Sequence, residues 1–419
     1  MTAFQPTFSK PAHANPSIQA LRAAARTRFE ALGFPTRRQE AWRFVNLGAV
    51  ITTEFAPERP GTIDVTPWSL PESLTLVFVN GRFDPERSNL TQIPPGMVIK
   101  TLADALEDDK GVAQSHLGTS AAFDDHPFVA LNTAQDLEGA FIHLLPGTDV
   151  EKTIHILYAG AGKNTVSYPR TLIVAESGAR ANIVESYVSE DQSLSCPVTE
   201  VAVAQDASIH HTRLQEEHLS ANHLGSVAVN LGSNAAYQLS SINLGAAVAR
   251  IDINVSLNGA GADASLDGLT LVGGTRQGDH HVRIDHKVGE CTSTQRFRSV
   301  LDDESRAVFT GRIVVAEGAQ GTDANQSSKS LVRSSDAVAF NNPQLEIYTD
   351  DVRCTHGSTV GRLDEEALFY LRARGIGRAE AEGLLTLAFA AEVLDAIPSK
   401  EIRTRLENLI TTRLGTETG

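Results

Sequence analysis

The sequence predicts a mainly β chain whose central part is a solenoid, most simply a β-helix, flanked by α-helical regions. Three observations support this fold class. From about residue 126 to 349, short strands rich in Val, Ile and Leu follow one another with hardly any helical spacing. Within them an imperfect repeat recurs, in which a small or acidic turn residue precedes alanine and an alternating strand. Apolar residues at helical spacing occur towards the two ends.

Residues 1–95 are expected to form an N-terminal helical region with a linker and a short strand. Ser17 can cap a helix, and Pro35 ends it. Residues 56–75 are rich in proline and indicate a linker. The run LVFVNGRFD at 76–84 predicts a strand that enters an Asn-Gly turn.

Residues 96–349 are expected to form the β core. The repeat aligns the alanines Ala181, Ala207, Ala235, Ala264 and Ala307. The first three spacings are 26, 28 and 29 residues, and the last, 43, breaks the period. A repeat of this length built from strands and turns is typical of a solenoid. Strand spacing alone leaves a β-sandwich or a propeller open as alternatives.

Residues 350–419 are expected to form a C-terminal helical domain. Asp364 can cap a first helix, which Gly375 ends. A second helix is predicted at about 378–396, and Ser399 can cap a third. The second helix is apolar over more than one face, so it suits a partner as well as internal packing.

Composition excludes several classes of function. The chain has 419 residues, a net charge of −15 and a pI of about 5.3, which argue against a nucleic-acid partner or an anionic membrane surface. It has no run of about 18 apolar residues that would span a membrane. The N-terminus lacks the apolar segment of a secretory signal. Three dispersed cysteines fit a reducing environment, so a cytoplasmic location is expected.

The run DDVRCTHGSTVGRLDEEALFYL, at 350–371, carries the main candidate site. Cys354 and His356 stand two residues apart in a short extended stretch, so both side chains point to the same face. One metal could therefore meet both, although two ligands are too few for a closed site. The remaining ligands would have to come from elsewhere in the fold or from another chain. The alternative is an exposed turn in which the cysteine and histidine only pack.

Other chemical motifs are absent or incomplete. In AGAGKNTV, Leu157 replaces the first glycine of a phosphate-binding loop, so the chain is not expected to hydrolyse ATP by itself. No pair of acids suggests a glycosidase, and no catalytic residue is assigned. His280, His281, His286 and Cys291 lie in or near alternating strands, and the sequence leaves their roles open.

The run 350–371 closely resembles the C-terminal signature of the SufB/SufD scaffold family of the SUF iron–sulfur cluster assembly system. TRRQEAWRFVNL, LVFVNGRFD and ALNTAQDLEGAFIHLLPG resemble segments of its N-terminal and central regions, so the resemblance covers nearly the whole chain from residue 36. It implies a right-handed parallel β-helix core. The length and the few cysteines are more similar to the SufD branch than to the longer, cysteine-bearing SufB branch.

The resemblance also implies a function. SufD is not a stand-alone enzyme: it pairs with SufB through the β-helices, and each binds one SufC ATPase through its C-terminal helices. A transient cluster or iron is shared at the SufB–SufD interface, where His356 matches the functional histidine and Cys354 the neighbouring cysteine. The sequence locates no site for the flavin associated with the family's complex. A homodimer of the isolated chain, a SufB-like homodimeric scaffold and a polysaccharide-acting β-helix enzyme remain alternatives.

Overall fold

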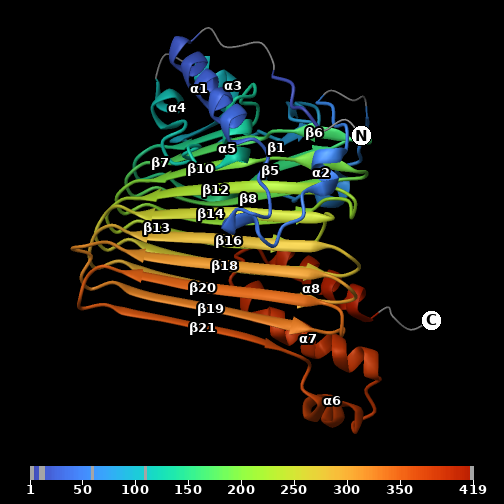
Figure 1. Ribbon diagram of the computed structural model, residues 1–419. Helices are drawn as coiled ribbons and strands as arrows, with labels where there is room; N and C mark the ends of the chain where they lie inside the picture. The colour runs from blue at the N-terminus through green and yellow to red at the C-terminus, as the bar shows by residue number, and fades with distance from the viewer. Residues whose placement is uncertain (1–3, 9–14, 58–60, 108–110, 416–419) are drawn as a thin grey trace.

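Two long β-sheets lie face to face in the centre of the molecule, with helices at both ends (Figure 1). The computed structural model describes residues 4–8, 15–57, 61–107 and 111–415. The ten-stranded sheet contains, in spatial order, β2 (Arg82–Phe83), β1 (Leu74–Val79), β5 (Asp149–Gly160), β8 (Arg180–Ser189), β11 (Ser208–Glu216), β13 (Ala236–Asn243), β15 (Asp263–Val272), β17 (Thr292–Leu301), β19 (Asp323–Val332) and β21 (Arg353–Gly361).

The eleven-stranded sheet completes the coils. Its path is β20 (Val338–Ile347), β18 (Arg306–Val315), β16 (Gln277–His286), β14 (Val248–Leu257), β12 (Asn222–Leu231), β10 (Val198–Val203), β7 (Arg170–Ala175), β4 (Ala140–Leu144) and β3 (Met97–Thr101), with β6 (Thr165–Ser167) and β9 (Ser193–Ser195) off this path. From β10 to β21, successive strands alternate between the sheets and pair in parallel. The predicted β-helix with flanking helices is therefore confirmed, and the sandwich and propeller alternatives are wrong.

A column of small residues forms one corner of successive coils. The residue after each corner donates its backbone N–H to the carbonyl of the corner residue in the preceding coil. For example, the Ser208 N–H donates to the Ala179 carbonyl at 2.8 Å. The column consists of Ala179, Ala207, Ala235, Ala262 and Cys291. All five are fully or almost fully buried, because only a small side chain fits inside the turn. The predicted alignment was wrong for Ala181 and Ala264, which lie two residues after the corner and are in register with Ile209 and Tyr237. The 43-residue spacing arises because Ala307 lies in β18 of the opposite sheet.

Helices of the N-terminal half cover one end of the β-helix and part of the eleven-stranded sheet (Figure 1). They are α1 (Pro16–Leu32), η1 (Glu40–Trp42), α2 (Gly48–Thr52), η2 (Thr66–Trp68), α3 (Leu102–Glu107), α4 (Val112–His116) and α5 (Pro127–Thr133). The predicted cap of the first helix, Ser17, is wrong. Asn15 caps it instead, with its side-chain oxygen accepting from the Ser17 backbone N–H at 2.9 Å, because Pro16 occupies the first helical position.

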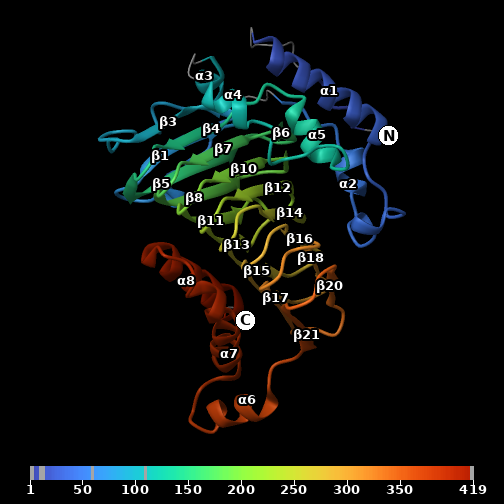
Figure 2. The same ribbon diagram turned by 90° about the vertical axis from the view of Figure 1, so that its left-hand side faces the viewer.

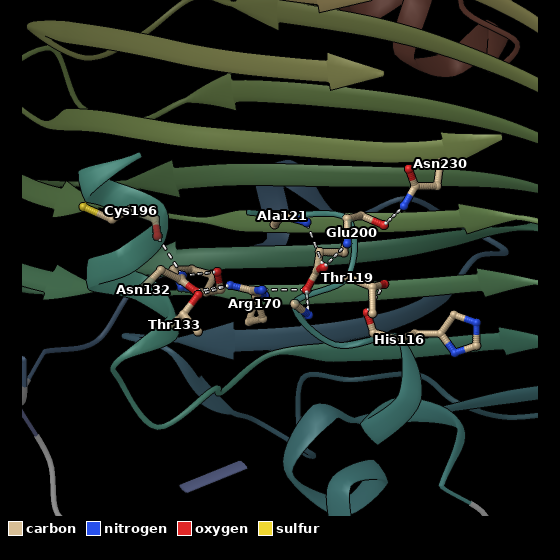
Figure 3. A network of polar contacts seen from close by, with 12 residues as sticks. His116, Thr119, Ala121, Asn132, Thr133, Arg170, Cys196, Glu200 and Asn230 are labelled. Atoms are coloured by element: carbon tan, nitrogen blue, oxygen red, sulfur yellow. Dashed lines mark hydrogen bonds and ion pairs between the residues drawn. The ribbon is translucent and has the colours of Figure 1, made fainter. Parts of the chain in front are cut away.

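A buried ion pair fixes the α4–α5 segment to the sheet (Figure 3). Arg170 on β7 lies 2.5 Å from a carboxylate oxygen of Glu200 on β10, and both side chains are fully buried. Arg170 also donates to Asn132 and Thr133 of α5. Glu200 accepts from the backbone N–H of Ala121 at 3.0 Å. Because both charges are paired and hydrogen-bonded, their burial is tolerated and sets where the segment lies.

Three helices end the chain: α6 (Glu365–Arg372), α7 (Arg378–Leu394) and α8 (Lys400–Gly415). The predicted caps are present, since Asp364 accepts from the Glu366 N–H at 2.9 Å and Ser399 from the Ile402 N–H at 3.3 Å. Figure 2 shows α7 and α8 alongside one face of the β-helix and α6 beyond its end. In the described part of the chain, no helix has the length and apolar character needed to span a membrane.

The helices α7 and α8 are held against the outer face of the ten-stranded sheet. Their apolar side chains share one buried cluster with that face, including Leu214, Ile242, Leu269, Ala390, Val393, Ile402 and Leu406. Arg405 of α8 binds both carboxylate oxygens of Glu216 at 2.8 and 2.7 Å. Arg298 of β17 pairs with Glu392 of α7. Apolar burial and charge-assisted hydrogen bonds therefore fix the position of these two helices.

Candidate functional site

The β-helix is open at the end where the chain leaves it. Among the described strands, β20 pairs with β18 alone and β21 with β19 alone, so each has one free edge. The side chains of β20 are mostly half-buried and those of β21 mostly exposed, whereas inner strands are largely buried. The last coil therefore presents unpaired backbone groups and uncovered side chains.

Cys354 and His356 both lie on β21. Register places Cys354 opposite Ala324 and His356 opposite Gln326 on β19. Cys354 packs with the buried cluster of Ile313 and Ala324, so it faces the space between the two sheets, called the lumen below. His356, two residues further on, faces the same side and is exposed at the open end. The structure thus brings the two predicted ligands onto one face of an edge strand.

The Cys354 thiol is partly shielded by its surroundings. Burial raises its pKa, as does the negative charge of Asp323, while a hydrogen bond from the backbone of Ala324 opposes both. In the free chain the thiol is therefore protonated at neutral pH. A metal must displace this proton, because the thiolate is the ligating form.

A hollow of about 760 Å³ adjoins the open end. Its walls include lumen-facing residues of the last coil, Asn341, Ser358 and Val360, and the outward Phe340, which stacks on Phe44 at 4.3 Å between ring centroids. Several large apolar side chains on or beside the last strands are exposed: Val338, Ile347, Tyr348 and Val360. Exposed apolar groups beside free strand edges are typical of a surface that another β-structure covers.

The site supplies few metal ligands by itself. Within the described ranges, no three or more His, Cys, Asp or Glu side chains gather in a way that could hold a metal ion. Cys354 and His356 therefore offer two ligands at most. A stable iron–sulfur site in proteins is usually held by four.

The other histidines lie elsewhere. His280, His281 and His286 lie on β16. His280 and His286 face the lumen, and His281 faces outward. His280 contacts Ser241 and Thr270 hydroxyls at 3.0 and 3.2 Å, and His286 contacts Ser293 at 2.9 Å. Burial lowers the pKa of His280 to about 3 and that of His286 to about 4, so both rings are neutral. Cys291 is a corner residue, and its thiol donates to the carbonyl of Gly259 at 3.3 Å.

Sequence reasoning missed the polar side chains inside the lumen. Glu185 contacts His211 at 3.1 Å, and Arg213 contacts His223 at 2.5 Å, all fully or almost fully buried. The alternation of strand residues could have placed Glu185, His211 and Arg213 on the inner face with Ile209. These residues were not predicted to lie there, because charged residues are normally assigned to the solvent-facing side of a strand.

Comparison with known proteins identifies the family. The model described as "SUF system FeS cluster assembly, SufBD core domain" matches residues 158–389, from β5 to α7. The chain belongs to the SufBD family. A second model, for the SufBD protein N-terminal region, matches residues 9–156. The family's core domain thus includes the whole open end with Cys354 and His356.

Individual relatives agree with the family match. An iron–sulfur cluster assembly SufBD family protein of Synechocystis is 30% identical over 401 residues, covering 91% of this chain and 88% of the relative. The iron–sulfur cluster assembly protein SufD of Escherichia coli is 30% identical over 396 residues, covering 91% and 90%. A chloroplastic protein of Arabidopsis thaliana is 26% identical over 411 residues, covering 93% and 85%. The chain is therefore similar to SufBD iron–sulfur cluster assembly proteins over nearly its full length.

Proposed function

We propose that this SufBD-family chain is the SufD-type subunit of a cytoplasmic SUF scaffold. It pairs with SufB through the open end of the β-helix, binds the SufC ATPase through its C-terminal helices, and helps to hold a nascent iron–sulfur cluster. One observation carries the proposal: Cys354 and His356 share the lumen face of β21, the edge strand of the last coil. Ligands placed at a free edge are available to a second chain.

Pairing of the two β-helices follows from the free edges. A partner strand beside β20 or β21 would satisfy their unpaired backbone groups and cover the exposed Val360 and Tyr348. Both sheets would then continue into the partner. The interface would lie directly against His356.

The ligand chemistry suits temporary binding. Imidazole and thiolate are both ordinary ligands of iron, and two of them cannot enclose a cluster. A SufB cysteine would complete the site, and the cluster could leave when the interface opens. The chain itself acts as a scaffold, and ATP hydrolysis is the task of SufC.

Mutation of the two ligands tests the proposal within the complex of this chain with SufB and SufC. His356→Ala should leave SufB pairing and SufC ATPase stimulation intact and reduce cluster formation severely. Cys354→Ala should reduce it less, because the principal thiolate comes from SufB. Thr355→Ala is the matched control, since Thr355 lies on the outer face of the same strand, where it contacts Asn325.

The outcomes separate the alternatives. Normal cluster formation by His356→Ala, or a defect that arises only because the complex dissociates, contradicts the assigned role. A chain that co-purifies with SufC and without SufB supports the homodimeric scaffold. A stable, stoichiometric cluster on the isolated chain contradicts a shared site.

A further inference from the structure

Two buried glutamines form a ladder that leads towards His356. Gln295 on β17 and Gln326 on β19 are register partners, and both lie in the lumen with at most 1% of their surface exposed. The Gln326 side-chain N–H donates to the side-chain oxygen of Gln295 at 2.9 Å. The side-chain oxygen of Gln326, Oε1, is buried and has no hydrogen-bond partner within the described chain. A buried acceptor without a partner is costly, so its surroundings indicate what it is meant to bind.

The direction of the ladder places that acceptor. The strands lie in the order β17, β19, β21. Nε2 of Gln326 points to Gln295 on β17. Because the oxygen and nitrogen of an amide diverge, we infer that Oε1 is directed away from β17, to the side of β19 on which β21 lies. The residue of β21 in register with Gln326 is His356. Stacked side-chain amides on neighbouring strands commonly donate to one side and accept from the other.

The opposite sheet holds the amide in this orientation. Gly311 on β18 faces Gln326 across the lumen, and a Cβ atom there would lie only 2.8 Å from Cδ of Gln326 and 2.6 Å from the ring of Phe309. The glycine is therefore required by the close approach of the glutamine. A side chain wedged in this way cannot turn freely, which is what a positioning group needs.

We propose that Gln326 positions His356: its Oε1 accepts a hydrogen bond from one ring N–H and so leaves the lone pair of the other ring nitrogen facing the open end. Histidines that bind metals usually donate their second ring N–H to a fixed acceptor, which sets the tautomer and the orientation of the ring. A neutral amide does this without the charge of a carboxylate, which would favour the protonated imidazolium. The functional consequence rests on the proposed function, whereas the hydrogen bond itself does not.

The experiment measures ¹⁵N chemical shifts of His356 in the full-length isolated chain, labelled at histidine and held at pH 8. The resonances are assigned by their loss in His356→Ala. The wild-type ring should show one protonated and one unprotonated nitrogen, that is, a single tautomer. Gln326→Met, which removes the acceptor at similar volume, should give averaged shifts of two tautomers. Ser328→Ala, at the next lumen-facing position of β19, is the control.

A second readout links the hydrogen bond to the complex. In the presence of SufB and SufC, Gln326→Met should slow cluster formation by roughly tenfold, the usual effect of removing such a supporting group. Identical His356 shifts in wild type and Gln326→Met overturn the inference, whatever the rate. Normal cluster formation by His356→Ala overturns the proposed function but does not contradict the hydrogen bond between Gln326 and His356.

Discussion

Glu185 and His211 show that charged groups inside the lumen are held by specific partners. Burial by itself would raise the pKa of Glu185, but the hydrogen bond and charge of His211 and the charge of Arg213 lower it to about 2. The Glu185 carboxylate also accepts from Thr199 at 2.9 Å. Groups on β10 and β11 thus stabilise the ionised carboxylate on β8, which fixes the relative positions of the three strands.

His280 gives a prediction about pH. Burial, and then the charge of Arg213, lowers its pKa to about 3 from 6.5, so the folded chain resists protonation. The unfolded chain takes up that proton below about pH 6.5, and stability is therefore lost as the pH falls from that value towards 3. His280→Asn should remove this loss. Between pH 7.5 and 5.5 the wild type should lose about 1 kcal/mol more than the variant, measured by urea denaturation. Parallel pH curves for the two proteins would contradict the assignment.

Single residues differ in how far the sequence reveals them. Cys354 and His356 could be selected because their spacing and motif are local. Gln326 could not, because an isolated glutamine carries no motif and its importance depends on register with β17 and β21. Register between strands about 30 residues apart is set by the turns between them and is not written in any short segment.

Among the elements, α6 is the least attached. The Asp364 cap and the first-turn acids Glu365 and Glu366 stabilise it locally. Phe369 is 75% exposed and Tyr370 57%, whereas α7 and α8 bury their apolar faces against the sheet. Two adjacent aromatic side chains that remain uncovered on a helix are typical of a binding surface.

The exposed aromatics of α6 give a prediction about SufC. The double variant Phe369→Ser with Tyr370→Ser should weaken SufC binding at least about tenfold, because aromatic anchors commonly contribute 2 kcal/mol or more each. The melting temperature should stay nearly unchanged, since neither side chain is buried. Leu219→Ser, at another exposed apolar residue far along the chain, is the control for a general loss of apolar surface. Unchanged SufC affinity, measured by calorimetry, would move the docking surface elsewhere.

Helices were easier to predict than their caps. The first and third C-terminal helices begin where Asp364 and Ser399 indicate, and the second begins at the predicted residue 378, since caps and helical spacing are local properties. At the first helix, Ser17 and Asn15 both suit the cap position, and Pro16 decides in favour of Asn15. The irregular 43-residue spacing was uninterpretable as a repeat, because it spans one and a half coils and changes sheet.

At the scale of the whole molecule, the solenoid is supported coil by coil and ends without a cover. Each strand of the core pairs with its neighbours in the same sheet, so an inner coil is stabilised from two sides and the last coil from one. The end formed by β20 and β21 should therefore be the least stable part of the core until a partner covers it.

Blocking the free edge of β21 tests this arrangement. The Arg353 N–H bonds to Thr322 in the ladder with β19, so alternate residues, including Ser358, direct their N–H to the free edge. Ser358→Pro removes one such donor and should leave the fold intact, because proline is tolerated on edge strands. The amount of SufB that co-purifies should fall at least about tenfold, because a strand contact at the centre of the interface is lost. Ser358→Ala keeps the N–H and should pair normally. Equal recovery of SufB by both variants would contradict pairing through this edge.

The overall architecture could be predicted from the sequence only in part. The repeat indicated a solenoid, because stacked coils need a similar residue at each turn. The parallel order and the choice of a β-helix over a sandwich came from the family resemblance. The open end could not be predicted, because it depends on where the last coil stops relative to the helices that follow.

The open end also affects how a cell must manage this protein. An uncovered pair of strand edges accepts any compatible strand, including those of a second copy of the same chain. Copies synthesised in excess of SufB would therefore occupy one another's binding edges and withdraw scaffold from use. We expect the supply of the two subunits to be matched, so that each newly folded edge meets its proper partner first.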